Sequence, residues 1–214
     1  MGGRNSTEKN STDPGEEWRK KRRKEKFYCF IFKEQEWWFS DVFGLLREKR
    51  YAEFEEIVKH EKEVINNLTY ENKYEPTMLI HAIEYTKENP HYYPEGYDHS
   101  IVEYLSNHEH CDINIPDSVS QTPFYFATVS GNLPAVKSLL ARDRSVLNKT
   151  TFMRSPLHLA VRHKELVEFF LQQPDLDVDI RDYHRKTPDQ IEGIDKDIKK
   201  MIQDYRKKSK ENKQ

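Results

Sequence analysis

The residues of this 214-residue chain with the most reactive side chains form one short run, His108-Glu109-His110-Cys111. Imidazole and thiolate groups are the ligands that zinc prefers, and His91 or His99 would be further ligands of the same type. The spacing of these residues nevertheless matches no closed zinc site. We therefore expect no metal in the protein, and we expect no cofactor.

Other arrangements that carry out catalysis are not found in the sequence. The chain has seven glycines, too few for a glycine-rich loop of the kind that cradles phosphates. No nucleophile lies in a recognisable elbow, and no pair of carboxylates lies in a recognisable catalytic motif. The sequence therefore predicts that the protein is not an enzyme.

A repeat of about 33 residues indicates which structural elements position these side chains. The pair Thr122-Pro123 recurs as Ser155-Pro156 and as Thr187-Pro188, at steps of 33 and 32 residues. A Thr or Ser hydroxyl caps the start of a helix, and proline suits the first helical position because it has no amide hydrogen there. A period of this length indicates a stack of helical units, which offers a long binding surface rather than a pocket of reacting groups.

The copy that begins at Thr122 predicts two helices. Gly131 can adopt the positive backbone angle that ends the first helix. Pro134 opens the second, and Val136, Leu139 and Leu140 fall on one face of it.

The two best copies resemble the ankyrin repeat family. Gln121 to Ala127, and still more closely Ser155 to Ala160, follow the family's Thr-Pro-Leu-His opening. The second copy lacks the family's Gly-His turn, and Arg162-His163-Lys164 stands in its place. The resemblance implies that His158 joins neighbouring repeats by hydrogen bonds rather than acting in catalysis. It also implies that the protein binds other proteins.

In weaker form the resemblance covers about residues 41–205. It predicts an all-α fold, which is an ankyrin-repeat solenoid of helix-turn-helix units with short hairpin loops. The five predicted repeats are residues 41–73, 74–117, 118–150, 151–182 and 183–205. The first would bury Leu45, Leu46, Phe54, Ile57 and Val58. Outside the repeats we predict a flexible tail over residues 1–26, an aromatic cap segment over 27–40 and a basic tail over 206–214.

The second repeat contains an insertion. Met78 precedes Pro123 by 45 residues, about 12 more than one period, and the excess lies at residues 88–98. This segment contains Tyr92, Tyr93 and Tyr97. Exposed aromatic side chains on a proline-stiffened loop lose little entropy on binding, so they are candidate partner contacts. The alternative is that they fold back on the second helix of their own repeat.

Family analogy points to the hairpin tips before each repeat as further partner contacts. The tip residues are Ser118 and Val119, Phe152 and Met153, and Tyr183 and His184. Phe152 and Met153 are apolar where the family usually has Asp or Gly. This unusual pair predicts either a contact with a partner or packing against a neighbouring repeat.

The N-terminus carries a possible lipidation signal. Met1-Gly2-Gly3-Arg4-Asn5-Ser6 fits the pattern for N-myristoylation of Gly2. One myristoyl chain binds a membrane only marginally, and a polybasic cluster would supply the second signal. That cluster is formed by Arg19, Lys20, Lys21, Arg22, Arg23 and Lys24. The same cluster also fits a nuclear import signal, and a tail that only aids solubility is the third possibility.

The charges are divided between the ends and the body. Residues 1–26 have a net charge of +4, residues 199–214 have +5, and residues 27–198 have −11. An acidic body repels nucleic acid and favours a protein partner with a basic surface, unless its carboxylates only solvate the outer helices. The chain has two cysteines, no apolar run long enough to span a bilayer and no signal peptide, so we expect an intracellular protein.

These observations predict a non-catalytic adaptor or inhibitor that binds a protein through its repeats at the cytoplasmic face of a membrane. The alternative is a soluble or nuclear protein of the inhibitor-of-kappa-B kind that masks a basic surface of a signalling protein or transcription factor. A third hypothesis is an accessory module for an enzyme supplied by another chain.

Overall fold

A computed structural model describes residues 42–60, 62–66, 76–85 and 99–211. Several predicted features lie outside these residues: Gly2, the basic cluster at 19–24, the aromatic segment at 27–40 and the insertion with Tyr92, Tyr93 and Tyr97. The chain divides into two compact units, an N-terminal unit of residues 1–61 and a C-terminal unit of residues 62–214. The division falls inside the predicted first repeat, 41–73.

The described part of the N-terminal unit contains two helical segments, residues 42–47 and α3 (Tyr51–His60). Between them Lys49 has a φ of 56°, and Arg50 binds Glu53 through two hydrogen bonds of 2.7 and 2.6 Å. The buried apolar side chains are Val42, Phe43, Leu45, Leu46, Phe54, Ile57 and Val58. The five residues expected in this core are therefore confirmed as buried.

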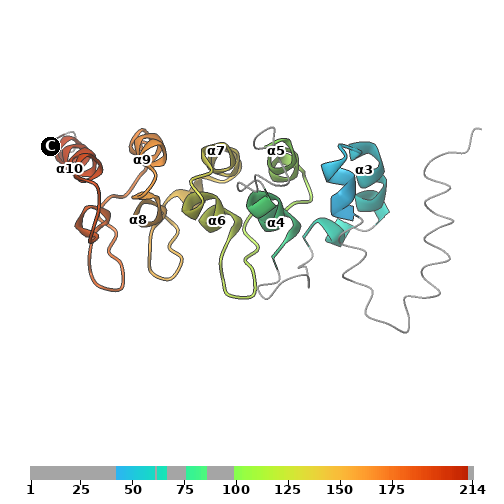
Figure 1. Cartoon of the computed structure of the whole chain (residues 1–214), viewed down its shortest axis with the longest axis horizontal. Coiled ribbons are helices and arrows are strands. Elements are labelled where there is room, and N and C mark those ends of the chain that lie inside the picture. The colour runs from blue at the N-terminus through green and yellow to red at the C-terminus, as the bar shows by residue number, and fades with distance from the viewer. Residues whose placement is uncertain (1–41, 61, 67–75, 86–98, 212–214) are drawn as a thin grey trace, which may run out of the picture. The chain divides into compact units, whose positions relative to one another are not determined.

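The C-terminal unit consists of successive helix pairs (Figure 1). Its elements in chain order are η1 (Lys62–Ile65), α4 (Met78–Tyr85), α5 (Ser100–Asn107), α6 (Pro123–Val129), α7 (Leu133–Arg142), η2 (Arg144–Asn148), α8 (Pro156–Ala160), α9 (Lys164–Leu171), η3 (Pro188–Gln190) and α10 (Lys196–Glu211). The predicted all-α repeat fold is confirmed.

The helix α6 and the start of α7 lie where the sequence predicts. Thr122 caps α6, since its Oγ1 accepts a hydrogen bond of 3.2 Å from the Tyr125 N–H, and Pro123 is the first helical residue. Gly131 has a φ of 72° after the end of α6. Asn132 then caps α7 through a hydrogen bond of 3.1 Å from the Ala135 N–H. Because each end is fixed by a local interaction, the short helices have defined lengths.

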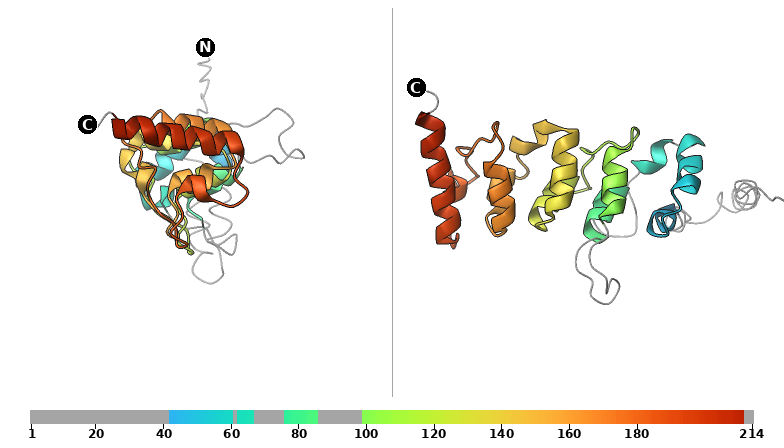
Figure 2. Two further views of the ribbon diagram at one scale, coloured as in Figure 1. Left: turned by 90° about the vertical axis from the view of Figure 1, so that its left-hand side faces the viewer. Right: turned by 90° about the horizontal axis from the view of Figure 1, so that it is seen from above.

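Two layers of helices stack along the C-terminal unit, as the views in Figure 2 show. The inner layer is formed by α4, α6 and α8, and the outer layer by α5, α7, α9 and α10. The core between them is apolar, with Leu105, Ala127, Val136, Leu139, Leu157, Val167 and Phe170 almost fully buried. Burial of such side chains between stacked repeats is the main source of stability in this architecture.

Two asparagines after the outer helices join their repeats to the next through backbone groups. Asn66 donates to the carbonyl of His110 at 2.7 Å and accepts from the Asp112 N–H at 2.8 Å. Two repeats further along the chain, Asn148 makes the same pair of bonds with the Asp175 carbonyl and the Asp177 N–H at 2.7 and 2.9 Å. A side-chain amide can satisfy one carbonyl and one N–H at the same time, so it bridges two loops that lack regular backbone pairing.

The last repeat differs from the sequence-based expectation. Its opening helix is reduced to the single turn η3, and α10 does not stop at Tyr205 but continues to Glu211. Most of the segment predicted as a basic tail, 206–214, is therefore helical. Within this segment Arg206 fixes the helix to the array, because it binds the buried Asp189 through two hydrogen bonds of 2.6 and 3.1 Å and binds Asp179 at 2.7 Å.

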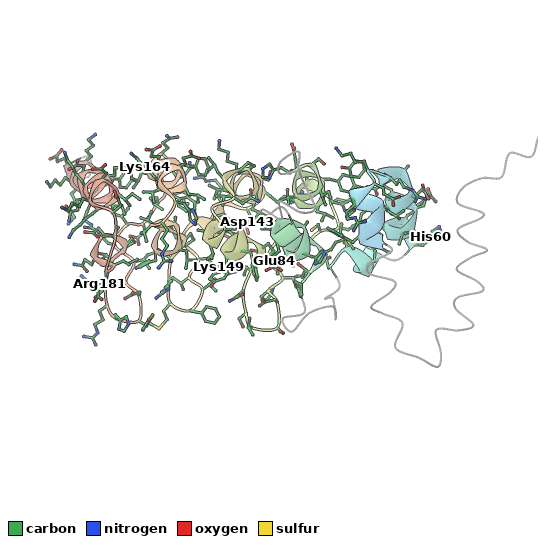
Figure 3. The ribbon with its side chains drawn as sticks, in the orientation of Figure 1. His60, Glu84, Asp143, Lys149, Lys164 and Arg181 are labelled. Carbon is green, nitrogen blue, oxygen red and sulfur yellow. The ribbon has the colours of Figure 1, made fainter. Side chains whose placement is uncertain are left out.

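Charged side chains such as Lys164 on α9 and Arg181 before the last hairpin lie on the outside of the unit (Figure 3). No helix in the described part of the chain is long and apolar enough to cross a membrane.

Candidate functional site

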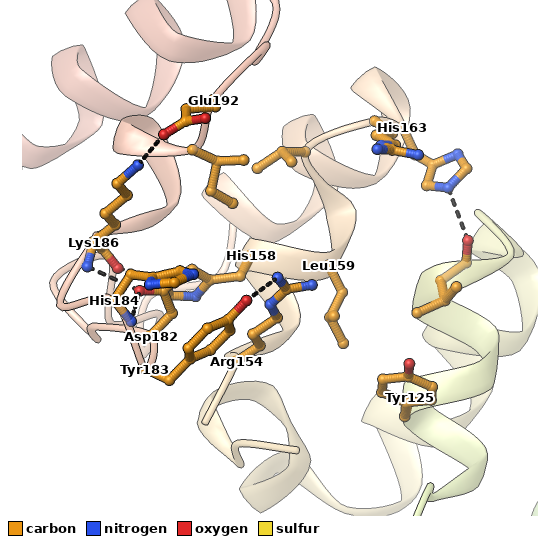
Figure 4. A pocket seen from close by; sticks show the side chains of 14 residues that line it. Tyr125, Arg154, His158, Leu159, His163, Asp182, Tyr183, His184, Lys186 and Glu192 are labelled. Carbon is orange, nitrogen blue, oxygen red and sulfur yellow. Dashed lines mark hydrogen bonds and ion pairs between the residues drawn. The ribbon is translucent and has the colours of Figure 1, made fainter. Parts of the chain in front are cut away.

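A groove of about 710 Å³ runs along the hairpin side of α6 and α8 (Figure 4). It is lined by residues of the last three predicted repeats. The lining consists of Tyr125, Val129, Arg154, His158, Leu159, Val161, Arg162, His163, Asp182, Tyr183, His184, Lys186, Ile191 and Glu192. Two of the predicted contact residues, Tyr183 and His184, belong to this lining.

The first and last hairpins of this region share one construction, based on an aspartate. Asp117 Oδ1 accepts hydrogen bonds of 3.0 and 2.7 Å from the N–H groups of Val119 and Gln121. Asp182 makes the same pair of bonds, both 2.9 Å, with His184 and Lys186. Burial alone would raise the pKa of Asp182, but these backbone donors lower it below its usual range. The carboxylate thus stays ionised and holds the loop.

The middle hairpin lacks this aspartate and adopts a different turn. Thr150 stands at its position, six residues before Pro156. Thr151 and Arg154 instead exchange two backbone hydrogen bonds of 3.0 Å across a two-residue turn. The turn residues Phe152 and Met153 both have positive φ, 50° and 59°. This is the geometry of a type I′ turn, which strongly favours Asn and Gly and is unfavourable for bulky apolar residues.

Exposed large apolar side chains gather at the groove and its hairpins. Among the described residues they are Val119, Val129, Phe152, Met153 and Tyr183, with exposed fractions between 37% and 61%. Four are hairpin tip residues, and Val129 lines the groove. The Phe152 ring meets Tyr125 edge-on at 6.2 Å and still leaves 56% of the residue exposed. Packing on a neighbouring repeat therefore covers the tip only in part.

His158 has the structural role that the resemblance implied. Its Nε2 donates a hydrogen bond of 3.0 Å to the carbonyl of Lys186 in the next repeat. Its Nδ1 accepts from the Ser155 N–H at 3.2 Å and lies 2.6 Å from the Ser155 hydroxyl. Burial lowers the pKa of His158, so the ring is neutral at neutral pH. A neutral imidazole with both nitrogens occupied joins two repeats and has no nitrogen left for catalysis.

His163 forms a second bridge, which sequence reasoning did not identify. Its Nε2 lies 3.0 Å from the carbonyl of Val129 in the preceding repeat. The ring also lies directly over Gly131, where an added Cβ would come within 2.5 Å of Nδ1. Gly131 is therefore required twice, for its positive φ and for the space that the imidazole occupies.

The charges in the groove differ from the charge of the body as a whole. Its two carboxylates are engaged, because Asp182 binds backbone N–H groups and Glu192 lies 2.6 Å from the Lys186 ammonium. Arg154 lies over the Tyr183 ring at 5.5 Å. In the part of the chain that the structure describes, the exposed Arg162 side chain forms no hydrogen bond or ion pair. The net negative charge of residues 27–198 is thus not located in this groove.

The run His108-Glu109-His110-Cys111 is described by the structure, whereas His91, which the sequence offers as a further ligand, lies outside the described residues. Cys111 is buried, and desolvation raises the pKa of its thiol to about 12, so it is not a thiolate at neutral pH. His108 Nδ1 accepts a hydrogen bond of 3.1 Å from the His110 N–H. Within the described ranges no three His, Cys, Asp or Glu side chains are placed to hold a metal ion.

Several groove residues were missed by sequence reasoning. Tyr125 and Val129 occur four residues apart on α6, and Arg154 and Arg162 stand at the two ends of α8. The signal for Val129 was an apolar residue directly before the turn that ends a helix. No sequence signal separates the two arginines from other surface charges.

Comparison with known proteins supports the architecture. The family model for ankyrin repeats, in three copies, matches residues 91–182, which include α5 to α9. No curated protein matches the chain. Ankyrin repeats are protein–protein interaction modules, and their fold is a non-catalytic interaction fold. The helix pairs, the Thr-Pro and Ser-Pro helix openings and the histidine bridge between repeats agree with this match, and residues 91–182 of the chain are ankyrin repeats.

Proposed function

We propose that the protein is a non-catalytic adaptor or inhibitor that binds a segment of a partner protein in the groove, with the hairpin tips as apolar anchors. The observation that carries the proposal is the location of the exposed large apolar side chains, which lie at the tips or in the groove wherever the structure describes them. Isolated apolar residues on a surface need no explanation, but a group on one face indicates an interaction site.

A variant of the middle hairpin tests this proposal without endangering the fold. Phe152→Asn with Met153→Gly places at the tip the residues that a type I′ turn favours. The variant is expected to fold at least as well as the wild type and to bind partners at least tenfold more weakly. The measurement is affinity capture followed by quantitative mass spectrometry with both proteins as bait, and Lys164→Ala on α9 is the control. Equal recovery of all partners by the two baits would contradict the proposal.

We further propose that acylation of Gly2 and the basic cluster at 19–24 hold the protein at the inner face of a membrane. The support is the sequence pattern and the need of a single myristoyl chain for a second signal. The net charge of the body supports a partner with a basic surface outside the groove.

Co-expression with an N-myristoyltransferase tests the membrane proposal. Intact mass should rise by about 210 Da, the mass of one myristoyl group. Binding to vesicles with anionic lipid should be lost in Gly2→Ala. An unchanged mass would overturn the tether, and the basic cluster would then be assigned to nuclear import and the protein to the kappa-B-inhibitor kind.

A further inference from the structure

We propose that the groove selects an acidic peptide segment, whose carboxylates are bound by Arg154 and Arg162. The inference rests on the proposed function and adds the chemistry of the bound segment. It differs from the expectation based on net charge, because it depends on the charges that line the groove and not on those of the whole body.

The charges that line the groove give it a net charge of +1. Lys186 and Glu192 neutralise each other at 2.6 Å, and the ionised Asp182 carboxylate is buried and bound by two backbone N–H groups. The exposed charges that remain are those of Arg154 and Arg162. A groove whose exposed charges are two guanidinium groups attracts carboxylates and repels basic segments.

The two arginines flank the same short helix. Arg154 lies two residues before α8 (Pro156–Ala160), Arg162 lies two residues after it, and both line the groove. The geometry therefore favours a segment with more than one acidic residue, because a single carboxylate would leave one of the two arginines without a partner.

Arg154 is preorganised by Tyr183. Its guanidinium lies 5.5 Å from the centre of the Tyr183 ring, and its Nη2 lies 3.4 Å from the Tyr183 hydroxyl. The His184 ring is tilted against the Tyr183 ring, with 3.9 Å between the two ring centres. An arginine held on an aromatic ring keeps donors available for a carboxylate and loses less entropy when it binds one.

Selection from a random library of 12-residue peptides displayed on phage tests this inference directly. Peptides selected on the full-length protein should be enriched in Asp and Glu over the unselected library. A synthetic peptide from this selection should bind at least tenfold more weakly to the double variant Arg154→Glu/Arg162→Glu. Its affinity should also fall when NaCl is raised, because the interaction is largely between charges.

The matched control is Lys164→Glu/Lys207→Glu, which makes the same change in net charge at exposed positions outside the groove. Circular dichroism should show that both double variants are folded, since all four side chains are exposed. Equal weakening by the two variants would overturn the inference, because it would indicate a general charge effect.

Other outcomes separate this inference from the proposed function. Selected peptides rich in Lys or Arg that still require Phe152 and Met153 would overturn the acidic segment and leave the binding function intact. Peptides that bind equally well to the Phe152→Asn/Met153→Gly variant would contradict the proposed function itself. Binding of a 12-nucleotide single-stranded DNA that is lost on charge reversal, with no acidic peptide selected, would assign the groove to nucleic acid and overturn the inference.

Discussion

Phe152 and Met153 combine two unfavourable properties in one turn, exposed apolar surface and positive φ. A residue with a Cβ in the left-handed region costs about 1–2 kcal/mol. Such strain persists at sites where the structure serves another purpose. At the residue scale the middle hairpin is therefore expected to be less stable than its sequence could make it.

Met153→Gly is expected to increase the free energy of unfolding by about 0.5–1 kcal/mol, because glycine adopts positive φ without steric cost but loses more entropy on folding. Urea denaturation of the full chain measures the change. Met153→Ala removes the same apolar atoms and keeps the Cβ, so it should give no such gain. A gain of the same size in both variants would show that the backbone is not strained.

Sequence reasoning identified the apolar character of this tip but not its turn. Phe152 and Met153 are not residue types that usually indicate a positive φ, so the sequence alone does not predict their backbone angles. All three hairpins have a positive φ at the third residue after the position that the aspartate occupies in the first and last of them, at Ser120, Met153 and Arg185. Only the middle hairpin, which has Thr150 in place of the aspartate, also has a positive φ at the second residue, Phe152. This difference becomes clear only beside the aspartate-based hairpins.

The pKa of His158 predicts that the protein is sensitive to mild acid. Since burial lowers this pKa in the folded state, the unfolded chain binds the proton more readily. The contribution of the neutral ring is complete above the ordinary histidine pKa of about 6.5 and is lost as the pH falls below it toward the folded pKa. The charge of Asp182 opposes this shift, and that of Arg154 supports it.

Urea denaturation at pH 7.5 and pH 5.5 measures the effect. The wild type should lose more stability between the two values than His158→Gln, which keeps a donor for the Lys186 carbonyl and cannot titrate in this range. The other eight histidines are common to both proteins, so their contribution cancels in the comparison. Identical losses in the two proteins would exclude His158 as the origin of the acid sensitivity.

At the scale of elements, the end of the last helix is the main difference between sequence and structure. The repeat period and the Thr-Pro pairs predicted α6, α7 and α8 because local caps fix their ends. The end of α10 depends instead on Arg206, which binds a carboxylate on η3 that is 3% exposed. In sequence this arginine is indistinguishable from the lysines that follow it.

Arg206→Ala should lower the free energy of unfolding by about 3 kcal/mol, because it leaves the buried Asp189 without its charged partner. Thr187 and Gln203 would retain their bonds to this carboxylate, so the loss is limited. Thermal and urea denaturation provide the measurement, and Lys207→Ala on the same helix should change stability by less than about 0.5 kcal/mol. Deletion of residues 206–214 should be as harmful as Arg206→Ala, whereas a simple basic tail would be dispensable.

At the scale of the C-terminal unit, stability is expected to depend on contacts between neighbouring repeats. A stacked array has no contacts between distant repeats, so a change at one end weakens the nearest repeat most. The helices α6, α7 and α8 each contact elements of adjacent repeats and should open least often. The terminal α10 is joined to the array by α9 and η3.

Amide hydrogen exchange followed by mass spectrometry tests this expectation. Protection should be greatest in peptides from α6 to α8, and Arg206→Ala should raise exchange first in α10 and η3 and then in α9. Peptides from α4 and α5 should exchange at wild-type rates under native conditions. A uniform increase along the unit would show that it opens in a single cooperative step.

Chemical modification of Cys111 can measure the rate at which the repeats open. Cys111 is 5% exposed, and desolvation raises the pKa of its thiol to about 12, so at neutral pH the sulfur is held as the unreactive thiol. Alkylating reagents and oxidants therefore act on this sulfur only in molecules whose second repeat has opened. In a chain with Cys29 replaced by serine, the rate of irreversible modification at Cys111 therefore gives the frequency of these openings. Because Cys111 is buried, the rate of its modification measures how often the second repeat opens.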